Sequence, residues 1–336
     1  MTRAVIVQQI GPGVTVQDMG RPGYLSQGLS RGGAADRLAL AEGAALLRQP
    51  IGAALEMAGM GGRFTVTAPT RIALTGAPMK ATLDGAPLAW QASHLVPPGA
   101  VLEIGGAKAG VYGYLSFGGG LVLPHILGAQ SAHLAAGLGA PVTVGQSLPL
   151  GDETGDATGL ILTPEPRWSG GELRILPSLQ TGLYPVEDRD RFAATRFTRD
   201  ARGNRMGVRL APEGEGFGLQ AGQTILSEVI TPGDIQIPGD GAPYVLLSEC
   251  QTTGGYPRIG TVIPADLPRI AQAPAGSDIH FRFVTRDEAL TAQAAFVKHL
   301  KALPGLAAPM YRDPAQIADL LSYTLISGAI TGKEEP

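Results

Sequence analysis

The chain has 336 residues, of which 44% are hydrophobic and 16% are charged, and its formal net charge is −3. Such a slightly acidic chain offers no basic surface for nucleic acid and no cationic face for an anionic membrane. The hydrophobic content is ample for packed cores, and the length suggests two domains. The single cysteine excludes an intrachain disulfide, which is compatible with a reducing compartment, and the cytoplasm is the default expectation.

The first half of the chain alternates short apolar runs with turn residues, which is typical of a mainly β domain. One helix is predicted over residues 37–49 from the helical spacing of its apolar side chains. Asp36 stands directly before this helix and is suited to cap its N-terminus. Strands are expected near residues 5–9, 64–66, 72–74, 81–83, 101–104 and 111–117.

Residues 109–151 contain no Asp, Glu, Lys or Arg, but ten glycines and three prolines interrupt the segment. No uninterrupted apolar stretch of about 20 residues exists there, so a membrane-spanning helix is not expected. The N-terminus also lacks the apolar core and cleavage site of a signal peptide.

The second half opens after residues 151–171, a polar, glycine-rich segment that is the best linker candidate. Thr285 and Glu288 have the spacing of a capping box, which predicts a helix from there to about residue 300. Strands are expected near residues 173–176, 224–230, 234–237, 244–247 and 279–284, and further helices over 185–197, 266–272 and 314–325.

One four-residue pattern occurs in both halves. The sequence Asp-Gly-Ala-Pro at residues 84–87 recurs at residues 240–243, each time after an expected strand. A duplicated β unit, one per half, is one explanation. Chance is the other, because Asp-Gly is common in hairpin turns.

Two loops of the first half carry candidate site residues. Asp18 and Arg21 lie three positions apart across a glycine and could hold a carboxylate or amide between them, because Arg presents a planar fork of donors. The alternative is a local salt bridge that braces the loop. Two glycines ahead of Asp36 resemble an anion site at a helix start, but the phosphate-binding P-loop pattern is absent from the chain.

The most polar loop of the second half is residues 251–257, Gln-Thr-Thr-Gly-Gly-Tyr-Pro, which follows the expected strand at 244–247. Paired glycines let a backbone approach a ligand closely, and the amide and hydroxyl groups supply donors and acceptors. We interpret the loop as a candidate binding site for a small molecule. The alternative is a glycine-rich turn between two strands. Cys250, just before it, is interpreted as a packing residue rather than a nucleophile.

Several kinds of chemistry find no support in the sequence. The five histidines are scattered, and none pairs with Cys, Asp or Glu at metal-ligand spacing, so no metal site is expected. No CxxC pair is present, and no lysine stands between methionines as in a biotin carrier. The chain is therefore not expected to carry a cofactor itself.

A set of segments in fixed order resembles the allophanate hydrolase subunit 2 family. They are residues 15–24, 33–36, 204–210, 232–238, 251–257 and 265–272. The family includes the C subunit of the bacterial ATP-dependent 5-oxoprolinase, the second half of the carboxyltransferase domain of urea carboxylase, and a protein that antagonises a sporulation-kinase inhibitor. An arginine is common in the family where Cys250 stands, so the substrate could differ from that of the best-known members.

The resemblance implies a mainly β fold of two cyclophilin-like β-barrels in tandem. The expected domains are residues 1–155, residues 172–284, and a helical C-terminal extension over residues 285–336. It further implies a protein partner, which is the 5-oxoprolinase B subunit or an allophanate hydrolase subunit 1-like chain. The implied substrate is a small amide, with no nucleic acid or membrane involved.

The function expected from the resemblance is that of the C subunit in a 5-oxoprolinase-like complex, which uses ATP to open 5-oxoproline to glutamate. Asp18 and Arg21 are the expected catalytic residues, which would orient or polarise the substrate. The expected substrate-binding residues are Gln251, Thr252, Thr253, Gly254, Gly255 and Tyr256, with Asp36 and Arg205 as supporting groups. One alternative is the carboxyltransferase half of a biotin-dependent system, the only interpretation that involves biotin. The other is a non-catalytic regulator that binds a subunit-1-like kinase inhibitor.

Overall fold

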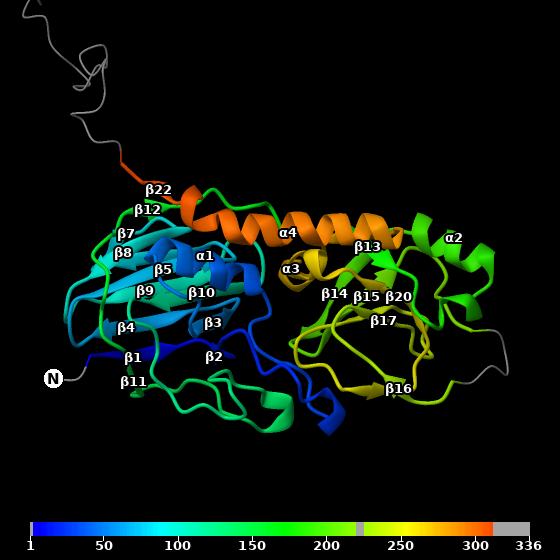
Figure 1. The fold of residues 1–336 in the computed structure, drawn as a ribbon, viewed down its shortest axis with the longest axis horizontal. Helices are drawn as coiled ribbons and strands as arrows, with labels where there is room; N and C mark the ends of the chain where they lie inside the picture. The colour runs from blue at the N-terminus through cyan, green and yellow to red at the C-terminus, as the bar shows by residue number, and fades with distance from the viewer. Residues whose placement is uncertain (1–2, 220–224, 312–336) are drawn as a thin grey trace, which may run out of the picture.

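A computed structural model describes residues 3–219 and 225–311, and the chain is mainly β, as the sequence predicts (Figure 1). Strands of the first half, together with one short strand at residues 308–309, form two sheets around one core, and strands of the second half close into a barrel. No helix among the described residues is long and apolar enough to cross a membrane. The proposed domain boundaries stay predictions.

The two sheets of the first half face each other across a core that includes Val7 and Phe64 from one sheet and Leu55 and Leu115 from the other. The six-stranded sheet has the order β11 (Ser147–Pro149), β1 (Ala4–Ile10), β4 (Gly62–Val66), β9 (Leu102–Ala107), β6 (Met79–Leu83) and β7 (Ala86–Pro87). The seven-stranded sheet has the order β2 (Thr15–Gln17), β3 (Ala54–Ala58), β10 (Tyr112–Phe117), β5 (Thr70–Gly76), β8 (Ala92–Val96), β12 (Leu160–Ile161) and β22 (Ala308–Pro309).

Helix α1 (Arg37–Leu47) covers the outer face of the seven-stranded sheet. Its Leu38 and Ala41 pack with Ala73 of β5, while Ile72 on the same strand points into the core between the sheets. Because both faces of β5 are covered, all of its residues are buried. Asp36 caps α1 as predicted, since its side chain accepts a hydrogen bond from the Ala39 amide.

The barrel of the second half has the strand order β13 (Gly171–Leu176), β20 (Arg258–Val262), β17 (Asp234–Gln236), β18 (Tyr244–Leu246), β15 (Gly207–Pro212), β14 (Phe197–Asn204) and β21 (Asp278–Phe283). Only the β13–β21 contact among these pairs is parallel. Helix α2 (Val186–Ala194) closes one end, where Phe192 lies 5.0 Å from the ring centres of both Phe197 and Phe281. A separate hairpin consists of β16 (Glu228–Val229) and β19 (Thr253–Gly254).

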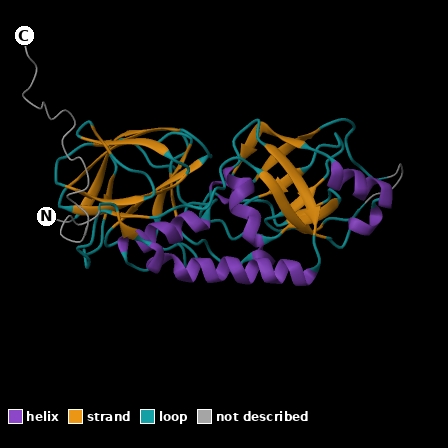
Figure 2. Cartoon of the chain, turned by 90° about the horizontal axis from the view of Figure 1, so that it is seen from above, coloured by secondary structure: helices purple, strands orange, loops and turns teal. Residues whose placement is uncertain are grey.

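Two helices connect the halves. Helix α3 (Leu267–Gln272) lies between them, and α4 (Arg286–Leu306) runs alongside both (Figures 1 and 2). The predicted capping box of Thr285 and Glu288 is confirmed at the start of α4. Because Leu303 is buried against the α1 side of the first half, α4 continues to residue 306 instead of ending near residue 300.

Other expectations need adjustment. Helix α2 ends at Ala194 because Phe197 is already paired with Ile279 in the barrel. The segment 151–171 is more than a linker, since it contributes β12 to a sheet of the first half. The helix expected over residues 314–325 lies outside the described residues.

The repeated Asp-Gly-Ala-Pro pattern occupies related places. Asp84 and Gly85 have φ values of 48° and 84°, which suits the tight turn that joins the paired strands β6 and β7. Asp240 and Gly241 lie in the connection between β17 and β18, which also pair antiparallel. Each copy thus connects two paired strands, as a duplicated β unit would require.

Candidate functional site

The cavity of greatest interest lies where α1, α3, α4 and the second barrel meet, and we call it the interdomain pocket. Its volume is about 330 Å³. Both halves and α4 contribute lining residues: Met19, Arg31, Ala34, Ala35, Arg37, Leu38, Ala41, Ile51, Pro232, Leu247, Ser248, Pro264, Leu267, Pro268, Gln293, Phe296 and Leu300. A pocket of this size with mostly apolar walls and a few polar groups suits a small organic ligand.

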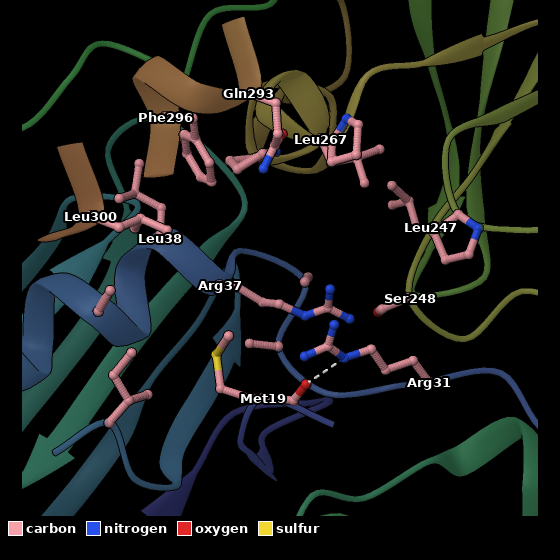
Figure 3. A pocket seen from close by; sticks show the side chains of 17 residues that line it. Met19, Arg31, Arg37, Leu38, Leu247, Ser248, Leu267, Gln293, Phe296 and Leu300 are labelled. Atoms are coloured by element: carbon pink, nitrogen blue, oxygen red, sulfur yellow. Dashed lines mark hydrogen bonds between the residues drawn. The ribbon is translucent and has the colours of Figure 1, made fainter. Parts of the chain in front are cut away.

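Two arginines form the polar floor of the pocket. Figure 3 shows the guanidinium groups of Arg31 and Arg37 lying close to each other beside Ser248, with Phe296 and Leu267 across the cavity. Arg31 donates from Nε to the Met19 carbonyl at 2.9 Å, and Arg37 donates to the Gly32 carbonyl at 3.1 Å. Burial and the charge of Arg31 lower the pKa of Arg37 to about 10.

Behind the floor, a buried ion-pair network fixes the loop that carries these arginines. Arg205 of the second half donates from Nε to Glu249 at 2.6 Å and also bonds Glu56 of the first half. Its remaining nitrogen donates to the Gly33 carbonyl at 2.5 Å. Glu56 in turn accepts from the Ala35 amide at 2.8 Å. One side chain therefore ties the barrel to the loop just before α1.

A second buried cluster holds the start of α1. Asp36 is fully buried and accepts from Arg167 Nε at 2.7 Å and from Gln272 Nε2 at 2.9 Å. Arg167 also makes a bidentate pair with Glu42, at 2.9 and 2.7 Å. The Tyr114 hydroxyl donates to Glu56 at 2.6 Å and accepts from the Asp36 amide at 2.8 Å. Tyr114 thus links the two clusters into one network.

Ser30, His133 and Glu249 resemble a nucleophile–base–acid triad, because Ser30 Oγ lies 2.8 Å from His133 Nε2. The hydrogen bonds argue otherwise. His133 Nδ1 accepts from the Ala136 amide at 3.2 Å, so in the neutral ring Nε2 carries the proton and donates it to Ser30. Burial, with Arg21 nearby, lowers the pKa of His133 despite Glu249. The arrangement braces the loop and does not activate the serine.

The expected catalytic residues Asp18 and Arg21 both bind the segment 126–131. Asp18 accepts from the Gly20 amide at 2.8 Å and from the Gln130 amide at 2.7 Å. Arg21 is buried and donates to the carbonyls of Ser131 and Ile126. Burial lowers the pKa of Arg21, although Asp18 and Glu249 counteract it. Both side chains therefore hold the segment 126–131 in place through hydrogen bonds to its backbone.

Asp18 also lines a second cavity of about 520 Å³ at the surface of the first half. This cavity and the interdomain pocket have two lining residues in common, Met19 and Ile51, so they are neighbours. His125, Gln130 and Asp152 line the second cavity as well.

The loop 251–256 lies elsewhere. Thr253 and Gly254 pair with the strand β16, the Thr252 carbonyl accepts from the Ile230 amide at 3.0 Å, and Tyr256 is 53% exposed. None of its residues lines the interdomain pocket or the second cavity. Ser248, three positions before the loop, does line the pocket. Whether the loop binds substrate stays a prediction.

Cys250 has the environment of a packing residue. Its side chain lies in an apolar cluster with Ile230 and Leu246 and is 3% exposed. Burial raises the pKa of the thiol to about 12, so little thiolate forms at neutral pH. Among residues 3–219 and 225–311, no group of three His, Cys, Asp or Glu side chains could hold a metal ion.

The structure thus brings Asp36 and Arg205 together in one buried network and leaves the loop 251–256 apart from them. Sequence reasoning missed the residues that complete the network, which are Glu56, Tyr114, Arg167, Glu249 and Gln272. A charged residue inside an apolar run, such as Glu56, is the sequence signal that indicates such a network, because a buried charge needs a partner.

Comparisons with known proteins give the family. Residues 27–283 match the model of a family described as carboxyltransferase domain, subdomain A and B. The 5-oxoprolinase C subunit of Haemophilus influenzae is 35% identical over 280 residues, which are 82% of this chain and 89% of the relative. The 5-oxoprolinase C subunit of Escherichia coli is 34% identical over 287 residues, 83% of this chain and 91% of the relative.

More distant relatives are longer proteins. A protein of Emericella nidulans that carries the name of a urea carboxylase is 27% identical over 313 residues, which are 25% of its length. The solved structure of TTHA0988 matches with a TM-score of 0.76 and 31% identity, over 84% of this chain and 56% of that chain. Urea carboxylase of Kluyveromyces lactis matches with a TM-score of 0.78 over 93% of this chain and 31% of its own, and at 23% identity it shows the shared fold alone.

Proposed function

Because the chain belongs to the carboxyltransferase domain family, subdomains A and B, we propose that it is the C subunit of an ATP-dependent 5-oxoprolinase-like complex. The observation that carries this proposal is 34–35% identity to two proteins named as the C subunit of 5-oxoprolinase, over more than four-fifths of this chain and most of theirs. The partner is a B-subunit-like chain, and the complex works in the cytoplasm.

The reaction is hydrolysis of a lactam. The ring C–N bond of 5-oxoproline breaks, one water supplies the hydroxyl to the carbonyl carbon and the proton to the nitrogen, and glutamate forms. A second water hydrolyses ATP, which supplies the driving force. An interdomain pocket of about 330 Å³ supports a substrate of this size.

The start of α1, which the sequence singled out as an anion site, does not fit the phosphates of ATP. Asp36 already accepts from the Ala39 amide there, and Glu42 lies further along the same helix. The Asp36 carboxylate therefore already occupies the place at the helix start that a phosphate would take. We therefore assign the nucleotide to the complex and derive no step through a nucleotide site in this chain.

The residue roles within this proposal are those predicted from the sequence. In this proposal Asp18 with Arg21 orients the substrate, and residues 251–256 contribute to binding it in the complex, although they line neither the interdomain pocket nor the second cavity of this chain. Asp36 and Arg205 position the loop before α1, which is supported by their burial and by their bonds to both halves.

The proposal is tested by co-expressing the chain with its A-subunit-like and B-subunit-like neighbours and measuring ADP formation that depends on 5-oxoproline. Activity that requires all chains supports it, and a full set of chains with no such activity rejects it. Asp18→Ala combined with Gln251→Ala tests the residue roles. The matched control is Asp190→Ala with Gln9→Ala, which changes the same residue types at exposed positions. Equal activity of the two double variants would reject the roles and leave the function intact.

A second candidate function is the carboxyltransferase half of a biotin-dependent system. The name of the matching family and the relative named for urea carboxylase favour it. It predicts that the complex binds a biotinylated carrier protein and transfers its carboxyl group to a small amide. Capture of the carrier, together with carboxylation without 5-oxoproline-dependent ATP hydrolysis, would replace the first proposal by this one.

A further inference from the structure

Three segments that are far apart in the sequence have no charged side chain. Residues 22–30, 109–151 and 250–257 contain no Asp, Glu, Lys or Arg, although 16% of the whole chain is charged. Charged residues are mostly exposed in folded proteins, so complete burial of the three segments would explain their absence. Much of each segment is exposed instead. The absence of charge therefore belongs to the surface of the molecule.

Tertiary contacts bring these uncharged segments together. Oγ of Ser30 in the first segment lies 2.8 Å from Nε2 of His133 in the second. A Cβ atom placed on Gly28 of the first segment would lie 3.9 Å from Oγ1 of Thr252 in the third. The three segments therefore form one surface to which both halves of the chain contribute.

Apolar side chains are exposed on this surface. Figure 1 shows η1 (Leu25–Gln27), η2 (Leu134–Ala136) and β16 on the side of the molecule opposite α4. Strand β16 belongs to the surface because its Val229 pairs with Thr253. Six residues with exposures from 38% to 56% make up what we call the docking face: Leu25, Ile126, Leu127, Leu134, Val229 and Tyr256. A gathering of exposed apolar side chains marks a protein interaction site.

The docking face limits the chemistry of what it binds. The cores of protein interfaces are depleted in charged residues and enriched in aromatic ones. Glu228, beside Val229, already pairs with Arg258 at 2.6 Å. A charged group pressed against this face would lose its water without gaining a partner, which costs free energy. The binding surface of the partner is therefore apolar, with neutral polar groups.

Both predicted site regions border the docking face. The loop 251–256 carries Tyr256, and the second cavity, which Asp18 lines, is also lined by His125 and Gly128 of the second uncharged segment. Among the described residues, the loop lines neither that cavity nor the interdomain pocket. A chain seated on the face would cover both regions and would close the space between them.

The length of a relative indicates what covers the face. The part of TTHA0988 that matches this chain is 56% of that protein, so the same fold is joined there to further polypeptide. We propose that the docking face binds the B-subunit-like chain and that the two chains together complete the site between the loop 251–256 and the Asp18 cavity. The inference rests on the proposed function for the identity of the partner, whereas the position of the face rests on charge, exposure and contacts in this chain.

The first test is the salt dependence of binding to the B-subunit-like chain, measured by calorimetry. Between about 50 mM and about 500 mM NaCl, we expect the affinity to change less than about threefold, because an uncharged face has no ion pairs for salt to screen. A loss of more than about tenfold over this range would overturn the assignment, because it would show that ion pairs hold the interface.

Variants locate the interface. Leu25→Glu, Leu134→Glu and Val229→Glu should each weaken binding at least about tenfold, because each would bury a carboxylate without a partner. The matched control is Leu290→Glu, since Leu290 is 57% exposed on α4, on the opposite side. It should change the affinity less than about twofold. Circular dichroism and thermal unfolding check that each variant folds.

Hydrogen exchange of the parent proteins needs no variant. Binding of the B-subunit-like chain should slow amide exchange in residues 25–28, 122–135 and 251–256. Exchange in α4 should stay unchanged. Protection of α4 with no protection of these three segments would overturn the proposal.

The outcomes separate this inference from the proposed function. Binding that the face variants weaken, in a complex without 5-oxoproline-dependent ATP hydrolysis, would support the face and reject the function. An active complex in which all three variants bind like the parent would overturn the face and leave the function intact. Self-association of this chain that the same substitutions abolish would assign the face to a second copy and overturn the choice of partner. Absence of any complex with the B-subunit-like chain would also overturn it.

Discussion

Gln272 on α3 and Asp36 at the start of α1 are 236 residues apart in the sequence, yet Gln272 Nε2 lies 2.9 Å from Asp36 Oδ2. The same amide donates to the Tyr112 carbonyl and accepts from the amides of Val111 and Tyr112, at 2.8 to 3.0 Å. All of its hydrogen-bonding positions are filled, and the residue is fully buried. One side chain therefore joins the second half of the chain to both a helix and a sheet of the first.

The first prediction concerns this junction. Gln272→Ala should lower the free energy of unfolding by about 3 kcal/mol, because it leaves the amides of Val111 and Tyr112 without their acceptor and removes one hydrogen bond to the buried Asp36 carboxylate. Urea unfolding followed by circular dichroism measures the change. Gln9→Ala, at an exposed position of β1, is the control and should be nearly neutral. A loss below about 1 kcal/mol for Gln272→Ala would mean that the junction is not a determinant of stability.

The second prediction concerns Arg205. Arg205→Ala should destabilise the protein by about 3–5 kcal/mol, because it leaves the buried carboxylates of Glu56 and Glu249 uncompensated. Removing those charges as well, with Glu56→Gln and Glu249→Gln in an Arg205→Met background, should restore part of the loss. Equal instability of the single and triple variants in chemical denaturation would contradict this explanation.

A third prediction is a pH dependence. Partial burial raises the pKa of Glu153, but bonds from Arg71 and the Gly155 amide, with Arg3 nearby, outweigh it and hold the pKa below its usual value. A depressed carboxyl pKa contributes stability that is present above the unfolded value and is lost as the pH falls through the folded value. The parent chain should therefore be more stable than Glu153→Gln at pH 7, and the difference should shrink below about pH 4.5. Unfolding curves from about pH 7 to about pH 3 measure it, and a constant difference would refute the assignment.

A fourth prediction follows from the hydrogen bonds of His133. Ser30→Ala should leave the activity of the complex unchanged and cost about 1 kcal/mol of stability, since only one neutral hydrogen bond is lost. The native protein should also resist labelling by a fluorophosphonate, which reacts with activated serines. Labelling at Ser30, detected by mass spectrometry of peptides, would show that the serine is a nucleophile after all.

The fifth prediction concerns Cys250. With a thiol pKa of about 12 and a buried side chain, the native protein should not react with iodoacetamide at about pH 8, whereas the urea-unfolded chain should react fully. Because the chain has a single cysteine, the mass of the intact protein reports the reaction directly. Rapid alkylation of the native protein would indicate an exposed, reactive thiol.

Local features were predicted well from the sequence. The caps at Asp36 and Thr285 and most strands are where the short-range pattern placed them, because capping and alternation depend on a few neighbouring residues. The ends of α2 and α4 were predicted less well, since contacts with Ile279 and with the α1 side of the first half decide them.

The candidate site could be predicted only in part. Asp36 and Arg205 were predicted from polar loops, but their partners Glu56, Gln272 and Arg167 stand in segments far apart in the sequence, and of these only Glu56, a charged residue in an apolar run, gave a local signal. The interdomain pocket could not be anticipated, because its floor, walls and upper side come from segments as distant as residues 19 and 300.

What the sequence by itself determined was the mainly β fold class, the helix starts and the family, since these follow from short-range patterns and from motifs in fixed order. Only the tertiary structure decided which polar groups have partners. Arg205 is buried and forms ion pairs that join the two halves. Arg31 and Arg37 instead lie beside a cavity, and among the described residues their acceptors are backbone carbonyls only. The reason is physical: whether a charge is satisfied depends on what the folded chain brings within about 4 Å of it, and that distance is set by contacts between residues remote in sequence.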